Sequence, residues 1–346
     1  MLESANHIKA TKNLCLLFVI SSIISFLYAV ITNTYNGDFL GVEVTLPVYI
    51  LLFNLLMNIV PFVFTYKIYV YFKKNELIRK ITIPINFLSI FLFFLLFWNA
   101  FVTILYGVGI MGAPPYEAPS GIKTIIQFMN RFNYGYGIFI YILASDKKNK
   151  TQFLLVFGLL ILAYLRSGLG VFMYLGMLFY IKYNDELNIF IRRRKLILVF
   201  LLFLFPVFVN TMYSLRDSLR NQSRDDVTID HPMTGKFIGR LSSFSDSALI
   251  LQEIPYFFIS AAGLDDYYFQ KQALGGVLSK DFMPQHRPEL IMIKFFYESA
   301  GDDISYMAGT NGNLYFSIMH SPFTFIINLV TIIFYIFSTF YLFSLL

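Results

Sequence analysis

The chain has 346 residues, of which 57% are hydrophobic and 19% aromatic, whereas only 14% are charged. This composition excludes an ordinary soluble domain, in which about a quarter of the residues carry charge. The formal charge of +6 would suggest nucleic acid as the partner of a soluble protein, but in so apolar a chain the basic residues report first on membrane orientation. The one cysteine, Cys15, excludes disulfides within the chain and thiolate metal clusters.

The apolar residues fall in blocks of about 18 to 25, the length that crosses a hydrocarbon core of roughly 30 Å. The sequence therefore predicts an all-α polytopic membrane protein with about eight membrane segments, including a broken helix pair, and one large, partly helical outer loop. No small-residue cleavage site follows the first block, so we expect that block to stay as a span. In chain order the predicted segments are 14–31, 46–66, 83–106, 124–144, the pair 153–165 and 170–181, 196–213 and 322–346.

The basic residues of the loops predict the orientation of these segments. Fifteen Lys and Arg residues lie in the N-terminal tail and in the stretches 67–80, 145–152 and 182–195, whereas the loops 32–45 and 107–123 hold only Lys123. This asymmetry places the N-terminus in the cytoplasm. The predicted domains are an N-terminal membrane domain over 1–213, a large periplasmic loop with interfacial helices over 214–321, and a C-terminal transmembrane helix over 322–346.

The broken pair carries Arg166 at its turn, "RSGLG". Basic stretches flank the pair on both sides, so the chain enters the membrane and returns, on arms of 13 and 12 residues. Such broken backbone at membrane depth is tolerated only when it is buried in protein or lines a water-filled cavity. An arginine there costs roughly 2.5 to 3.5 kcal/mol on insertion, so it implies an anionic partner or water. The alternative is an arginine that snorkels to the interface or pairs with a structural carboxylate.

The loop 214–321 opens with three arginines that recur every fourth residue, Arg216, Arg220 and Arg224. On a helix they would line one face, and their mutual repulsion would call for an anion or for carboxylates. Arginine suits phosphate and diphosphate oxygens because it binds them bidentately. The alternative is pairing with the interleaved carboxylates of Asp217, Asp225 and Asp226.

Further along this loop, Arg240 precedes a hydroxyl-rich helix start, in which Ser242, Ser243 and Ser245 could cap a helix and bind an anion. A plain capped surface helix is the alternative. The following stretch, 248–263, contains a glutamate and a proline and is typical of an interfacial or re-entrant helix.

Three carboxylates, Glu298, Asp302 and Asp303, lie in a glycine-rich and aromatic segment that leads back to the membrane. Near arginines, such a carboxylate can deprotonate a hydroxyl while the cations stabilise a departing phosphate. The alternative is that each of them is simply solvated, which is more common for carboxylates in outer loops. The sequence has no nucleotide-phosphate loop, no HExxH, no CxxC and no GxSxG, so it predicts no metal and no cofactor.

Several of these segments resemble the O-antigen polymerase (Wzy) family of bacterial inner-membrane proteins. The similarity covers 153 to the C-terminus and is carried by "LRSGLG", "GRLSSFSDSA" and "YESAGDDISYMAGTNGNLYFSIMHSP". The chain is shorter than usual members and has no basic tail after its last predicted span. The resemblance implies a multi-pass glycosyltransferase of lipopolysaccharide biosynthesis, which joins undecaprenyl-diphosphate-linked O-antigen repeat units at the periplasmic face of the inner membrane.

The resemblance also implies roles for residues and partners. Arg166, Arg240 and Glu298 match the family's functional positions, and we expect them to share one cavity as catalytic residues. The expected substrate-binding residues are Arg216, Arg220, Arg224, Arg287, Asp302 and Asp303. The expected partners are lipid-linked oligosaccharides, membrane lipids and a chain-length regulator protein, without nucleic acid.

Two other classes stay open. A glycan ligase would share the arginine-lined cavity. A transporter of lipid-linked sugars is disfavoured by the long outer segment and by the absence of an internal repeat.

Overall fold

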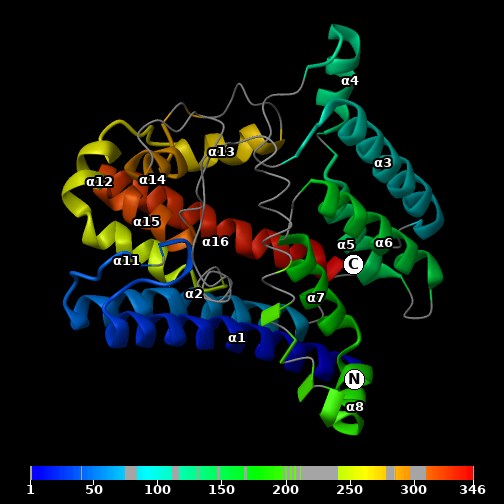
Figure 1. The fold of residues 1–346 in the computed structure, drawn as a ribbon, viewed down its shortest axis with the longest axis horizontal. Helices are drawn as coiled ribbons and strands as arrows, with labels where there is room; N and C mark the ends of the chain where they lie inside the picture. The colour runs from blue at the N-terminus through cyan, green and yellow to red at the C-terminus, as the bar shows by residue number, and fades with distance from the viewer. Residues whose placement is uncertain are drawn as a thin grey trace. The chain divides into compact units, whose positions relative to one another are not determined.

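The computed structural model describes residues 2–39, 41–74, 84–110, 117–130, 132–145, 149–166, 170–197, 241–277, 284, 286–296 and 309–345, with isolated residues between 199 and 211 (Figure 1). The described residues form helices, and none of them lies in a β-strand. One isolated β-bridge joins Thr34 to Glu43 beside the short 3-10 helix η1 (Gly37–Phe39). The all-α class is therefore confirmed.

Four of the described helices are long and apolar enough to cross a membrane, which makes the chain an all-α membrane protein. They are α1 (Leu2–Thr32), α2 (Val48–Lys74), α3 (Ile85–Tyr106) and α16 (Pro322–Leu345). Two shorter apolar helices, α6 (Lys150–Leu165) and α7 (Gly170–Lys182), match the predicted broken pair. The count of eight segments, the position of 214–321 outside the cell and the turn at membrane depth stay predictions.

The predicted segment 124–144 is wrong as a single helix. The structure has α4 (Ser120–Met129) and α5 (Tyr134–Ala144) in its place. The side chain of Asn133 caps α5 by accepting a hydrogen bond of 3.1 Å from the Tyr136 backbone N–H. This cap satisfies a backbone donor that has no partner inside α5, so a new helix begins there.

The described chain divides into two compact units. One contains Met1–Thr11, Asn75–Asp230 and Leu342–Leu346, and the other contains Lys12–Lys74 and His231–Tyr341. These units group segments that pack together, whereas the predicted domains separate the membrane segments from the loop outside the membrane. The predicted domains stay a prediction.

In the first unit, α3, α5 and α6 pack around buried Leu92, Leu96, Ile138 and Leu159. The ammonium of Lys182 at the end of α7 is buried here, and it donates to the Ser145 carbonyl oxygen (2.7 Å) and to that of Ile142. These carbonyls belong to the C-terminal end of α5, where a positive charge is favourable. The short helix α8 (Asn184–Arg193) follows α7.

In the second unit, α2 packs with α11 (Phe244–Gln252), α12 (Ile254–Ala261), α13 (Tyr268–Val277), α14 (Pro288–Phe296) and α15 (Gly309–His320) around an aromatic core. The predicted single helix over 248–263 is wrong, because the chain breaks at Glu253 between α11 and α12. Pro255 lies in the first turn of α12, where its missing backbone N–H costs no hydrogen bond.

Candidate functional site

Arg166 lies directly after the last residue of α6 and is surrounded by neutral oxygen atoms from α3 and α5. Its Nε donates to Thr103 Oγ1 (2.8 Å) and its Nη1 donates to the Tyr134 hydroxyl (3.0 Å). Its Nη2 donates to both oxygens of Asn99, at 2.9 Å from Oδ1 and 3.4 Å from the carbonyl oxygen. No carboxylate among the described residues contacts this guanidinium, so its positive charge has no counter-ion there.

The partners of Arg166 are held in orientation by further hydrogen bonds. The amide nitrogen of Asn99 donates back to the carbonyl of Leu95 (2.8 Å), which turns Oδ1 toward the guanidinium. The Thr103 hydroxyl donates to the Val108 carbonyl (2.9 Å) and therefore offers a lone pair to Arg166. A Cβ at Gly109 would lie 2.9 Å from Arg166 Cζ, so a larger residue there would force the guanidinium to shift, and the positive φ of this position also favours glycine.

Two donors of this cluster keep a hydrogen for a further acceptor. Arginine has five N–H groups, and the contacts with Thr103, Tyr134 and Asn99 use four of them. The Tyr134 hydroxyl accepts from Arg166 and donates to none of the described residues, while its ring lies 5.6 Å from Arg166 Cζ. One N–H of the Arg166 guanidinium and the O–H of Tyr134 are thus both available to a further acceptor. Because the guanidinium is positively charged, an anionic oxygen is the acceptor that this pair of donors favours.

Most of the other predicted site residues lie outside the described residues. The structure places Arg287 immediately before α14, where its carbonyl oxygen accepts the first backbone hydrogen bonds of that helix. Arg166 and Arg287 belong to different compact units. The roles of Arg240 and Glu298, and the shared cavity, stay predictions. The residues outside the described part are Arg216, Arg220, Arg224, Arg240, Glu298, Asp302 and Asp303.

The serines before α11 serve packing as well as capping. Ser242 Oγ accepts from the Phe244 N–H (3.3 Å), whereas the side chain of Ser243 makes no capping bond. Ser242 and Ser245 are buried and bond to Ser25 (3.0 Å) and Asn36 (2.7 Å). These two hydroxyls therefore attach the start of α11 to α1 and to the loop that follows α1.

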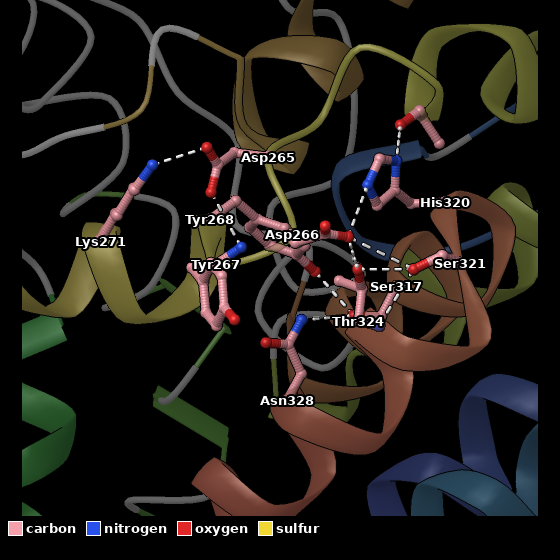
Figure 2. A network of polar contacts seen from close by, with 11 residues as sticks. Asp265, Asp266, Tyr267, Tyr268, Lys271, Ser317, His320, Ser321, Thr324 and Asn328 are labelled. Atoms are coloured by element: carbon pink, nitrogen blue, oxygen red, sulfur yellow. Dashed lines mark hydrogen bonds and ion pairs between the residues drawn. The ribbon is translucent and has the colours of Figure 1, made fainter.

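A second polar cluster, which the sequence did not point to, is centred on Asp266 in the second unit (Figure 2). One carboxylate oxygen of Asp266, Oδ1, accepts from three side chains at the junction of α15 and α16. The donors are Thr324 Oγ1 (2.7 Å), His320 Nε2 (3.2 Å) and Ser321 Oγ (3.4 Å). Oδ2 forms no hydrogen bond with a described residue, and 47% of the side chain is exposed. The carboxylate is therefore fixed through one oxygen and open at the other.

Both ring nitrogens of His320 face acceptors. Nδ1 lies 3.0 Å from the Ala261 carbonyl oxygen, and Nε2 lies 3.2 Å from Asp266 Oδ1. A carbonyl and an ionised carboxylate can only accept, and each ring nitrogen donates only when it carries a hydrogen. His320 thus joins Asp266 to the last residue of α12.

The residues beside Asp266 form three further contacts that order the turn between α12 and α13. Asp265 Oδ2 pairs with Lys271 (2.6 Å), and Asp265 Oδ1 accepts from the Tyr267 N–H (2.9 Å). The buried Tyr268 hydroxyl donates to the Asn313 carbonyl (2.7 Å) and so attaches α13 to α15. Figure 2 shows Lys271 bonded to Asp265 at one end of this turn and the side chains of His320, Ser321 and Thr324 bonded to Asp266 at the other.

The Asp266 cluster predicts a loss of stability in acid. The hydrogen bond from Thr324, aided by the charge of His320, lowers the pKa of the Asp266 carboxyl below its usual value. A carboxyl with a lowered folded pKa stabilises the protein above the unfolded pKa of about 3.9, and this contribution is lost as the pH falls through the folded value. We expect Asp266→Asn to reduce the drop in melting temperature between pH 5 and pH 2.5, measured on detergent-solubilised protein.

The control for this measurement is Glu117→Gln. Glu117 is exposed and forms no hydrogen bond or ion pair with a described residue. The acid-induced drop of Glu117→Gln should therefore match that of the wild type. An equal drop in Asp266→Asn and the wild type would contradict the prediction.

Comparisons of the chain with protein-family models, with curated proteins and with solved structures found no match. The fold and the two clusters define an all-α membrane protein with a cation in one polar cluster and a carboxylate in the other. Function must therefore be argued from these sites.

Proposed function

We propose that the chain is a membrane glycosyltransferase that polymerises undecaprenyl-diphosphate-linked repeat units at the periplasmic face of the bacterial inner membrane. The observation that carries this proposal is the arginine cluster. Arg166 stands among apolar helices with neutral partners and with two unused donors beside it. A lipid diphosphate would supply the missing negative charge and the missing acceptors.

The chemistry of such a reaction fits the residues of this chain. Outside the cell there is no ATP, so the energy comes from the sugar–diphosphate bond of the donor. The protein needs to hold the diphosphate, orient both lipid-linked substrates and take a proton from the acceptor hydroxyl. Arginines perform the first task, and the proposed base is Glu298. A glycan ligase would use the same groups, so the acceptor distinguishes the two.

The experiment that tests this function uses the purified full chain in liposomes with an undecaprenyl-diphosphate-linked repeat unit as the only substrate. A polymerase converts it into a ladder of longer lipid-linked glycans on a gel. In cells, deletion of the gene should leave surface lipopolysaccharide with one repeat unit. Lipopolysaccharide without any repeat unit after deletion, with no ladder in liposomes, would instead indicate a ligase or a transporter.

A further inference from the structure

We propose that Asp266, Tyr267 and Phe323 form a binding subsite for a saccharide, at the turn between α12 and α13 and the first turn of α16. The ligand is the sugar part of a lipid-linked repeat unit, an assignment that rests on the proposed function. The subsite itself is argued from the geometry of these side chains.

The carboxylate of Asp266 is prepared for a hydrogen-bond donor from outside the protein. Thr324, His320 and Ser321 all bond to Oδ1, so they fix the side chain without occupying Oδ2. A carboxylate oxygen in this state can only accept, and the hydroxyl groups of a sugar can donate to it. The lowered pKa keeps the carboxyl ionised, which suits a binding role better than proton abstraction near neutral pH.

Two exposed aromatic rings belong to residues that adjoin Asp266 and Thr324 in sequence. Tyr267 and Phe323 are 48% and 54% exposed, and their rings meet edge to face with centroids 6.3 Å apart. Tyr267 follows Asp266 in sequence, and Phe323 precedes Thr324, which itself bonds to Asp266. The Asp266–Thr324 hydrogen bond and the Tyr267–Phe323 ring contact therefore join the same two segments, the turn before α13 and the first turn of α16. A sugar offers C–H groups to an aromatic face and hydroxyls to a carboxylate, and this surface provides both.

The charged side chains around the subsite lie in pairs. Asp265 forms an ion pair with Lys271, and Asp266 lies 3.2 Å from His320 Nε2. Such a surface carries no excess of basic groups that would attract an acidic partner. A polyhydroxyl compound is favoured, because it needs fixed acceptors and apolar area rather than net charge.

The place of the subsite also fits a lipid-linked sugar. Phe323 and Thr324 belong to the first turn of α16, which is apolar and long enough to span a membrane from Pro322. A sugar on a membrane lipid lies at this boundary. Exposed aromatic side chains at the same height can instead anchor a helix at the interface. The experiment has to separate these two roles.

The test is binding of a lipid-free oligosaccharide to the purified full chain in detergent, where interfacial anchoring plays no part. The probe is the repeat-unit oligosaccharide released by mild acid from the lipid-linked intermediates of the host, and binding is followed by saturation-transfer NMR. We expect Tyr267→Leu and Asp266→Asn each to weaken binding about tenfold, the usual effect of losing one good contact. Tyr267→Phe keeps the ring and should bind within about threefold of the wild type.

The matched control is Tyr49→Leu, because Tyr49 is an exposed tyrosine near the start of the membrane-length helix α2. This variant should bind like the wild type. Unchanged binding in both Tyr267→Leu and Asp266→Asn, or no binding by the wild type, would overturn the subsite. An equal loss in Tyr49→Leu would assign the effect to general tyrosine anchoring and would also overturn it.

The result also separates the subsite from the proposed function. Because Tyr267 is exposed, Tyr267→Leu should keep the melting temperature of the wild type, and it alone decides the outcome if Asp266→Asn does not fold. Oligosaccharide binding without any polymer ladder in liposomes would contradict the polymerase and leave the saccharide subsite standing. A normal polymer ladder together with unaltered oligosaccharide binding in Tyr267→Leu would contradict the saccharide subsite and leave the polymerase standing.

Discussion

Arg166→Ala is expected to abolish polymerisation in the liposome assay. The substitution removes the one positive charge of a cluster whose other members, Asn99, Thr103 and Tyr134, are neutral. In a medium of low dielectric constant, a cation that faces the diphosphate stabilises it far more than the same cation would in water. The polymer ladder should disappear, while the protein is still recovered from the membrane in normal amounts.

Two conservative variants separate charge from hydrogen bonding at this position. Arg166→Lys keeps the charge but loses the planar guanidinium that can bind two oxygens at once, so it should restore part of the ladder. Arg166→Gln keeps a donor without the charge and should be as inactive as alanine. A purely structural arginine would give the opposite order, because glutamine can still bond to the oxygens of Thr103 and Asn99 without burying a charge.

The hydroxyl of Tyr134 offers a finer test of the same cluster. Tyr134→Phe removes one acceptor of Arg166 and the unused O–H, and it leaves the ring in place. The unpaired Nη1 then loses about 1 to 3 kcal/mol of stabilisation unless the ligand takes over. A full ladder in Arg166→Ala at normal expression would remove the anion-site argument altogether.

The long helices could be predicted from the sequence because their signal is local. Apolar blocks of sufficient length mark α1, α2, α3 and α16, and the glycines around Arg166 mark the break between α6 and α7. The breaks at Asn133 and Glu253 were missed because composition hides them. Asn133 lies inside a block of membrane length, and Glu253 lies inside the apolar stretch 248–263. One capping side chain or one proline decides where the new helix begins.

The partners of the site residues could not be predicted from one sequence. Arg166 was singled out because a charge in an apolar block is unusual, but the oxygens that surround it lie 32 to 67 positions away in the chain. From the sequence, the surroundings of Arg166 could be an anion or water, the membrane interface, or a structural carboxylate. The structure instead surrounds it with neutral oxygens of Asn99, Thr103 and Tyr134. The Asp266 cluster was missed for the same reason, because 54 residues separate Asp266 from His320. The pair of carboxylates before two tyrosines, and the histidine just before a span, were its only local signals.

Glu298→Gln is expected to keep lipid binding and to lose turnover. In the proposed reaction the acceptor hydroxyl gives its proton to the Glu298 carboxylate as its oxygen bonds to the anomeric carbon, and the sugar–diphosphate bond breaks with its electrons going to the diphosphate. The amide has the shape of the carboxyl group and cannot take the proton, so the rate should fall by about 10² to 10⁴. The measurement is single-turnover elongation in liposomes, together with retention of the lipid-linked substrate by the purified variant. Glu253→Gln is the matched control, because Glu253 lies between α11 and α12 and has no assigned role in the reaction. It should elongate like the wild type.

Elongation by Glu298→Gln within about twofold of the wild type would be far short of the loss expected for a missing base. That result would assign the base to Asp302 or Asp303 instead. Loss of substrate retention together with turnover would instead make Glu298 a binding residue, since a base acts only after both lipids are held.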